Sequence, residues 1–283
     1  MSVKLREARP EDAERCGRIC YEAFRTINAE HNFPPDIPTP EMGIGLLSMM
    51  IAHPGFHAIV AERNGVVIGS NVLDERNEIA GVGPITVDPQ GQNAGVGRLL
   101  MQHVIERAKP FAGVRLVQAA FHNRSLSLYT KLGFDPREPL SCVQGTPFAQ
   151  QIPGFTVRKA IETDLAACDA VCRLVHGHTR SGEVADAIQS GNAQVVLRDD
   201  RITGYSTGIA FFSHAVGERN EDVQALIAAA HAFHGPGFLV PTRNAALLRW
   251  CLDRGLRIVQ PMTLMSIGRY AEPRGAWLAS ISY

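Results

Sequence analysis

The order of hydrophobic and polar positions in the first half of the chain predicts alternating strands and helices. Short apolar or alternating runs, which are typical of strands, occupy residues 3–8, 57–62, 66–75, 79–87 and 114–121. Apolar positions recur at helical spacing over residues 10–24, 41–53 and 95–109, and a further helix is predicted to begin at Asn123. Four prolines between residues 29 and 40 predict a loop. The resulting order, β-α-α-β-β-β-α-β-α, indicates an α/β or α+β domain.

The strands predicted at 79–87 and 114–121 are expected to be parallel neighbours, because a helix connects them. Pro84 lies inside the first of these strands, where it cannot donate a ladder hydrogen bond. Gly81 and Gly83 beside it permit a bulge. We therefore expect this strand to be irregular.

The second half of the chain begins like the first. "LREARPEDAERCGRIC" from Leu5 aligns at one fixed offset with "VRKAIETDLAACDAVC" from Val157, and each predicts a strand, a turn and a helix. Such self-similarity indicates duplicated units. The stretch 144–155, with two prolines and two glycines, is typical of a linker. We expect two domains, residues 1–150 and residues 151–283.

Composition and charge narrow the range of partners. Lys plus Arg and Asp plus Glu each number 28, so the net charge is zero and predicts no general attraction to nucleic acid. No run approaches the about 18 to 20 apolar residues that cross a membrane, and the start of the chain is unlike a signal peptide. Cysteines and histidines show no metal-ligand spacing. We expect a cytoplasmic protein without a metal, a membrane or a nucleic-acid partner.

A glycine-rich turn, "VDPQGQNAGVGRLL" at 87–100, joins a predicted strand to a predicted helix. Free backbone N–H groups and the helix dipole make such a turn a site for an anion such as phosphate. A tight turn without a ligand is the alternative. A P-loop is excluded because Arg98 and Leu99 follow Gly97 where Lys and Ser or Thr are needed. The pattern at Gly81 and Gly83 lacks the third glycine of a dinucleotide fingerprint.

The run from Gln92 to Gly97 fits (Gln/Arg)-x-x-Gly-x-(Gly/Ala). It resembles the pyrophosphate loop of the GNAT superfamily of acyl-CoA N-acyltransferases. "FHNRSLSLYTKLGF" at 121–134 is similar to that family's fifth strand end and fourth helix, and the likeness covers most of residues 3–140. The resemblance implies two tandem GNAT-like domains. Each would have a mixed, mostly antiparallel sheet with a splayed parallel strand pair and flanking helices.

The resemblance also implies a division of labour among residues. Backbone N–H groups would hold the coenzyme A pyrophosphate at Gln92, Asn93, Ala94, Gly95, Val96, Gly97 and Arg98. The pantetheine and acyl carbonyl would lie along the backbone of Ile85, Thr86 and Val87. Asn123 would contact the pantetheine, and Tyr129 would stand near the thioester sulfur. The cosubstrate would be acetyl-CoA.

Acyl transfer to an amine needs a proton donor for the departing thiolate. Tyrosine, with an ordinary pKa of about 10, keeps its proton at neutral pH, so Tyr129 is predicted to be the general acid. The general base is not evident. Candidates are Asp74, Glu75, Glu78 and His122, and a water chain could serve instead. The acceptor pocket could be walled by Phe33, Leu46, Met49 and Met50, although core packing explains these residues equally well.

We expect an N-acetyltransferase that acts on a primary amine of a small molecule or peptide. A non-catalytic coenzyme A-binding module is the alternative. In the second unit, Glu218, Glu221 and Asp222 stand where the glycine turn would be, and they would repel a pyrophosphate. Trp250 or Cys251 falls at the place of Tyr129. This unit is therefore predicted to bind no coenzyme A and to have a structural or substrate-shaping role. The tail at 257–283 is expected to close its sheet, and could also face the first site.

Overall fold

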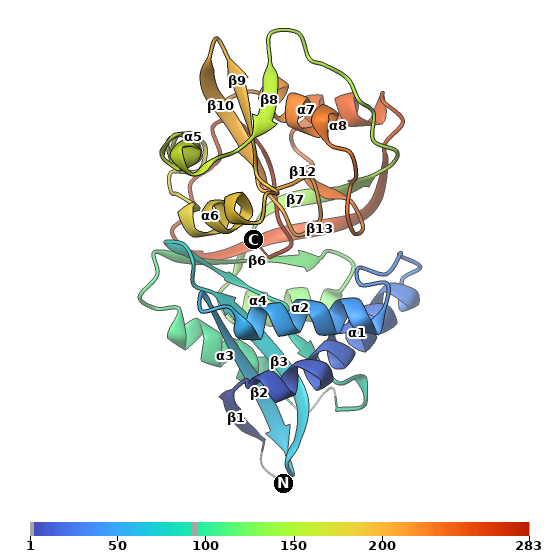
Figure 1. Ribbon diagram of the computed structural model, residues 1–283. Helices are drawn as coiled ribbons and strands as arrows, with labels where there is room; N and C mark the ends of the chain where they lie inside the picture. The colour runs from blue at the N-terminus through green and yellow to red at the C-terminus, as the bar shows by residue number, and fades with distance from the viewer. Residues whose placement is uncertain (1–2, 92–94, 283) are drawn as a thin grey trace.

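The chain forms two halves, one above the other in Figure 1, and contains two β-sheets, the larger of which has strands from both halves. The structure is a computed structural model that describes residues 3–91 and 95–282. The first half comprises β1 (Lys4–Glu7), α1 (Ala13–Glu30), α2 (Pro40–Ala52), β2 (Phe56–Arg63), β3 (Val66–Asp74), β4 (Ile79–Val82), β5 (Thr86–Val87), α3 (Val96–Arg107), β6 (Gly113–Ala119), α4 (Asn123–Lys131) and β7 (Asp135–Gln144). The second half comprises β8 (Thr156–Lys159), α5 (Leu165–His176), α6 (Ser181–Gln189), β9 (Gln194–Arg198), β10 (Arg201–Ser206), β11 (Ala215–Gly217), α7 (Asn220–Ala229), β12 (Phe238–Pro241), α8 (Ala245–Leu252), β13 (Arg257–Gly268) and β14 (Ala276–Leu278). Short 3₁₀ turns at Pro10–Asp12, Pro89–Gly91 and Glu162–Asp164 precede α1, α3 and α5.

Both sheets are mostly antiparallel, as predicted. The nine-stranded sheet has the order β1-β2-β3-β4-β6-β13-β7-β12, with β5 paired to β3, and the five-stranded sheet has the order β14-β11-β10-β9-β8. Alternate residues of a strand face opposite sides of a sheet. On β2, Ala58 and Val60 therefore pack with the core under α1 and α2, whereas Ile59 and Ala61 pack with the core under α3. The mixed fold class expected from the sequence is confirmed.

The strand predicted at 79–87 is broken in two. β4 pairs in parallel with β6 from Ile79 opposite Gly113 to Gly81 opposite Arg115. Beyond Gly83, whose φ is +141°, the chain continues as β5, which pairs with β3 instead. The expected splay between two parallel strands is therefore present. It leaves a gap beside the last residues of β6.

The duplication seen in the sequence is repeated in three dimensions. Arg6 binds Asp12 at 2.7 Å, and Arg158 binds Asp164 at 2.6 Å. Each carboxylate also accepts a backbone N–H at the turn before the helix, from Arg9 in the first half and from Ile161 in the second. In each half, the aspartate thus ties the first strand to the start of the following helix.

The closing strands of the two halves are exchanged, which the sequence did not predict. We expected the tail to close the sheet of its own unit, but β13 lies between β6 and β7 in the first sheet. β7, the last strand of the first half, pairs in turn with β12 of the second. Only the short β14 extends the five-stranded sheet, beside β11. Because β7 pairs with β12 and β13, the edge of β6 is taken by β13.

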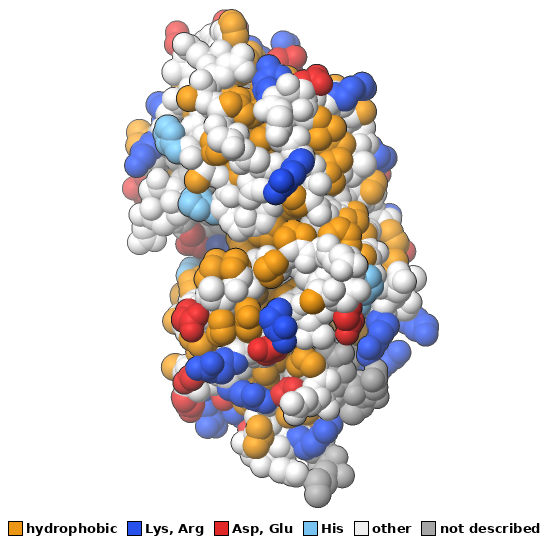
Figure 2. All heavy atoms as spheres, turned by 90° about the vertical axis from the view of Figure 1, so that its right-hand side faces the viewer, with side chains coloured by type: hydrophobic (Ala, Val, Ile, Leu, Met, Phe, Trp, Pro, Cys, Tyr) orange, Lys and Arg blue, Asp and Glu red, His pale blue; other side chains and the backbone are white. Residues whose placement is uncertain are grey.

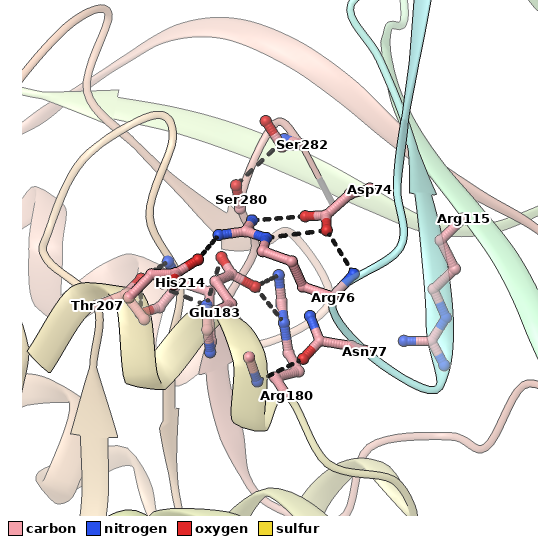
Figure 3. A network of polar contacts seen from close by, with 12 residues as sticks. Asp74, Arg76, Asn77, Arg115, Arg180, Glu183, Thr207, His214, Ser280 and Ser282 are labelled. Carbon is pink, nitrogen blue, oxygen red and sulfur yellow. Dashed lines mark hydrogen bonds and ion pairs between the residues drawn. The ribbon is translucent and has the colours of Figure 1, made fainter. Parts of the chain in front are cut away.

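A polar network joins the halves near the β3–β4 connection (Figure 3). Arg76 binds Asp74 at 2.5 Å within its own half and Asp186 at 2.8 Å on α6 of the other. Beside it, the backbone N–H of Gly182 donates to Asn77. Deeper in the second half, burial alone would raise the pKa of Glu183, but Arg180, His214 and the hydrogen bond from His214 hold it well below its usual range. The network therefore contains charged side chains that are largely shielded from water.

Removing the arginine from this network is expected to destabilise the whole chain. Arg76→Ala leaves Asp74 without its cation and Asp186 with only the ring of His53, at 3.3 Å, and breaking a buried ion pair typically costs about 3 kcal/mol. Urea unfolding measures the loss. The matched control is Arg18→Ala, whose pair with Glu14 is exposed and contributes about 0.5 kcal/mol or less. Similar losses in the two variants would contradict this account.

Acid is expected to destabilise the junction through a buried histidine. Burial, together with the charge of Arg115, lowers the pKa of His178 to about 3, so the folded protein keeps this ring neutral. The unfolded chain binds a proton near its ordinary pKa of about 6.5. The stability contributed by the neutral ring is therefore complete above about pH 6.5. It is lost as the pH falls toward 3, by up to about 1.4 kcal/mol per pH unit.

Urea unfolding near pH 7.5 and near pH 5.5 measures this dependence. The His178→Asn variant is expected to lose less stability between the two conditions than the unchanged protein. Burial also lowers the pKa values of His176 and His214, so a part of the acid sensitivity remains in the variant. If His178→Asn loses as much stability between the two pH values as the unchanged protein does, this ring is not the cause of the acid sensitivity.

Candidate active site

A cavity of about 710 Å³ lies where β4 and β6 diverge. One side is formed by the connection from β4 to β5, and the other by the last residues of β6 and the start of α4. The N-terminus of α3 forms one end. α1 and a part of the second half form the remaining walls.

Most of the residues expected from the sequence to contact coenzyme A line this cavity. They are Ile85, Thr86, Val87, Gly95, Val96, Gly97, Arg98, Asn123 and Tyr129. Gln92, Asn93 and Ala94 lie outside the described residues. The structure thus brings together residues that are more than 40 positions apart in the sequence, from 85 to 129.

Three of the four candidate bases are not among the residues that line the cavity. Asp74 is bound to Arg76, Glu75 is bound to Arg107, and Glu78 accepts a backbone hydrogen bond from Thr179. These carboxylates therefore take part in contacts at the surface or at the junction between the halves. His122 does line the cavity.

The N-terminus of α3 presents donors to the cavity. Its N-cap is Gly95, which has a φ of +78° in the left-handed region and offers no side chain to cap the helix. The first helical hydrogen bond is from Leu99 to the Gly95 carbonyl, at 3.1 Å. The N–H groups of the first turn, Val96 to Arg98, precede it and therefore have no acceptor within the helix. With a helix-dipole charge of about +0.5, they suit an anion.

Basic side chains gather next to this helix terminus. A smaller hollow beside the cavity is lined by Arg98, Arg124 and Lys131, together with Asn123, Ser127 and Leu128. Three cations around a helix N-terminus give a positive potential that suits several phosphate charges. The sequence analysis identified the turn but not the two basic residues of α4.

Tyr129 stands on α4 with its ring packed edge-on to Phe134. Burial raises the pKa of Tyr129 to about 12, although a hydrogen bond from Ser125 acts in the opposite direction. The phenol therefore carries its proton throughout the physiological pH range. This is the state that a general acid requires.

His122 and Ser125 lie beside Tyr129 at the start of α4. The Ser125 hydroxyl is 2.5 Å from His122 Nδ1. Burial lowers the pKa of His122, with Arg124 and His31 acting in the same direction, so this ring is neutral at pH 7. Ser125 was not singled out from the sequence. The signal was present in the spacing, because intervals of three and four residues place His122, Ser125 and Tyr129 on one helix face.

Some buried polar atoms of the cavity have no partner in the described protein. They are Thr86 Oγ1 and both amide atoms of Gln118 on β6. Buried polar groups are almost always hydrogen-bonded, so these atoms point to a polar ligand. A chain with amide and carbonyl groups running along the gap would satisfy them.

Apolar side chains from both halves also line the cavity. Phe24, Ile27 and Leu46 contribute from the first half, and Phe211, Phe212, Met262 and Ile281 from the second. Phe212 is 41% exposed. In the side view, hydrophobic side chains also gather on the surface near the level where the halves meet (Figure 2). The tail thus faces this cavity through Met262 and Ile281.

Only some of the residues proposed for the acceptor pocket lie at the cavity. Leu46 lines the cavity, and Phe33 stacks on Phe121, a cavity residue, at 4.2 Å between ring centroids. Met50 is buried in the core, and Met49 is largely exposed. A buried carboxyl that the sequence did not identify, Asp36, also lines the cavity and accepts a hydrogen bond from Gln260 of the second half.

In the described part of the second half, residues 151–282, the gap that corresponds to the cavity is filled. At the N-terminus of α7, Asp222 accepts the backbone N–H of Arg219, and Glu218 binds Arg201. Between β11 and β12, the positions that correspond to the splayed pair of the first half, β14 pairs with β11, and the next residue, Ala279, bridges to Leu239 of β12. A peptide strand therefore fills the gap that stays open in the first half.

Comparison with known proteins defines the class of this chain. The sequence profile of the Acetyltransferase (GNAT) family matches residues 21–134. A curated relative, the UPF0157 protein YqkA of Bacillus subtilis, is 30% identical over 83 residues, which are 29% of this chain and only 24% of the relative. This chain thus spans about a quarter of the length of that protein.

Solved structures match nearly the full length. A Pyrococcus horikoshii protein provisionally classed as an acetyltransferase has a TM-score of 0.75 at 16% identity, covering 97% of this chain and 94% of its own. A GCN5-related N-acetyltransferase of Sphaerobacter thermophilus has a TM-score of 0.61 at 16% identity, covering 99% and 98%. A tandem GNAT protein of the clavulanic acid pathway has a TM-score of 0.55 at 14% identity, covering 94% and 98%.

Residues 21–134 match the GNAT family, and the whole chain has the fold of a tandem GNAT protein. The family match covers the half that contains the cavity, and the whole-chain matches share the two-domain fold. The family is one of acetyltransferases, so acyl transfer is the class of activity that the match indicates. Among residues 3–91 and 95–282, no group of three or more His, Cys, Asp or Glu side chains could hold a metal ion, and no helix is long and apolar enough to span a membrane.

Coenzyme A is expected to bind this chain once, at the N-terminus of α3. A Cβ on Gly97 would make only ordinary contacts, at 3.8 Å from Leu128, so Gly97→Ala is expected to bind acetyl-CoA almost normally. Gly97→Asp adds a negative charge among the first-turn N–H groups and is expected to abolish binding. Calorimetry measures both affinity and stoichiometry. Two coenzyme molecules per chain, or undiminished binding by Gly97→Asp, would contradict the expectation.

Proposed function

We propose that this protein transfers an acetyl group from acetyl-CoA to a primary amine of a small molecule or peptide. The observation that carries the proposal is a single cavity that contains both the uncapped N-terminus of α3 and the protonated Tyr129. An anion site and a proton donor are the two elements that transfer from a coenzyme thioester needs. The family match supports the same class of reaction.

The cavity fits coenzyme A along its length. The first-turn N–H groups of α3, with Arg98, Arg124 and Lys131 nearby, would bind the phosphates. The pantetheine would run between β5 and the end of β6, where Thr86 and Gln118 have polar atoms without protein partners. The second half supports this placement, because a peptide strand occupies the corresponding gap there.

Tyr129 would donate its proton to the sulfur as the carbon–sulfur bond breaks. The acceptor must attack as the neutral amine, which costs about 4.6 kcal/mol at pH 7 for an amine with a pKa of about 10.4. The apolar wall built from both halves would bind the body of the acceptor. We therefore assign acyl-CoA binding to residues 1–150 and acceptor shaping to residues 151–283.

A non-catalytic coenzyme A-binding module remains the second candidate, but no described feature of the cavity favours it. A protonated phenol that lines the same cavity as the anion site is not needed to bind coenzyme A alone. A panel of primary amines tests the choice directly. Release of free thiol that depends on the amine supports transfer, whereas binding of acetyl-CoA without any thiol release supports the module.

Removal of one hydroxyl is expected to separate chemistry from binding. Tyr129→Phe should lower turnover by roughly 10²–10⁴-fold, the usual contribution of a placed general acid, with little change in coenzyme affinity. Thiol release and calorimetry measure the two quantities. The control is Tyr21→Phe, which removes a hydroxyl from a tyrosine that does not line the cavity. Near-normal turnover of Tyr129→Phe would exclude this residue as the acid.

A further inference from the structure

Three polar side chains at the start of α4 line the cavity together. His122 directly precedes the helix, Ser125 lies in its first turn, and Tyr129 lies one turn further. The Ser125 hydroxyl is 2.5 Å from His122 Nδ1. Ser125 and Tyr129 are four residues apart and therefore neighbours on one helix face, and the Ser125 hydroxyl acts to lower the pKa of Tyr129 against the larger effect of burial.

The order in which these three side chains donate hydrogen bonds follows from the number of polar hydrogens that each one carries. Neutral histidine has one N–H, and serine and tyrosine each have one O–H. If the His122 proton lies on Nδ1, it is donated to Ser125, and Ser125 then donates its own proton to Tyr129. This order leaves the Tyr129 proton directed at the cavity and leaves a lone pair on His122 Nε2. Each hydroxyl accepts one hydrogen bond and donates one.

Resting on the proposed acetyl transfer, we propose that His122, Ser125 and Tyr129 form a proton relay that moves the proton lost by the acceptor amine to the departing sulfur. His122 Nε2 takes the proton from the amine nitrogen as the new carbon–nitrogen bond forms. His122 Nδ1 passes its proton to Ser125, and Ser125 passes its proton to Tyr129. Tyr129 gives its proton to the sulfur as the carbon–sulfur bond breaks.

The relay balances without any other reactant. The amine loses one proton and the thiolate gains one, and all three side chains end neutral. His122 ends with its proton on Nε2. Proton exchange with water and rotation of the two hydroxyls restore the starting arrangement.

The charges around the relay keep His122 able to accept a proton. Arg124 and His31 oppose the charged ring and Glu30 favours it, and burial adds to the opposition. The other carboxyl groups that line the cavity are Glu30, at the exposed end of α1, and Asp36, which is held by Gln260. Within the described residues, neither carboxyl group is hydrogen-bonded to Ser125 or Tyr129, whereas His122 contacts Ser125, so the proposed link to the acid passes through Ser125.

Substitution at Ser125 breaks the relay and leaves its two ends in place. We expect Ser125→Ala to lower kcat by about 10²-fold, the lower end of the range for a placed proton-transfer group, without a change in acetyl-CoA affinity. The limb of the kcat/KM pH profile that reports His122 should remain, because the base is intact. His122→Gln should abolish that limb. Ser125→Thr keeps a hydroxyl and should restore most of the rate.

The matched control is Thr130→Ala, which removes an exposed hydroxyl from the same helix at a residue that is not among those lining the cavity or the basic hollow. It should leave kcat unchanged. Equal rates for Ser125→Ala and the unchanged protein would overturn the relay and leave the proposed transferase function intact. A protein that binds acetyl-CoA but acetylates no amine would contradict both proposals.

Nitrogen-15 NMR of the histidine rings tests the order of donors without any turnover. The relay requires neutral His122 to carry its proton on Nδ1 in the unchanged protein. This preference should disappear in Ser125→Ala and persist in Thr130→Ala. A proton on Nε2 in the unchanged protein would overturn the relay, because Ser125 would then donate toward His122.

Discussion

Three residue pairs hold β4 beside β6, and beyond Gly81 the two strands separate. Everything proposed for this protein depends on that separation, because it leaves the end of β6 without a neighbour on one side and opens the cavity. A break of this kind is costly in an ordinary sheet, since unpaired backbone groups need partners. The second half shows one solution, in which β14 fills the corresponding gap. In the first half, a substrate chain with amide groups would do the same.

The cavity also depends on the exchange of closing strands. Because β13 lies against β6, Met262 reaches the wall of the cavity, and Gln260 holds Asp36 there. The loop after β10 adds Phe211 and Phe212. The gap in the described part of the second half is filled, and residues of that half form a part of the wall of the cavity in the first. A degenerate repeat can therefore be retained for its shape.

Much of the fold and of the cavity could be predicted from sequence because their signals are local. The Arg6–Asp12 pair recurs as Arg158–Asp164, and the glycine turn leads directly into α3. The end of α1 was placed too early, at about Phe24, because its last turns carry few apolar positions; the helix continues to Glu30. The exchange of β7 and β13 could not be predicted, since both strands would pair equally well in either half. Asp36 and Gln118 owe their burial to those long-range pairings.

The exchange has a consequence for how the protein can be divided. Residue 150 falls in the linker of the sequence, yet a fragment that ends there would retain β6 without β13 and β7 without β12. It would expose apolar strand edges, which are templates for aggregation. A duplicated chain with reciprocally exchanged last strands has the connectivity of a strand-swapped homodimer whose two copies have become one polypeptide. The two halves are thus units of ancestry, whereas the unit of folding is the entire chain.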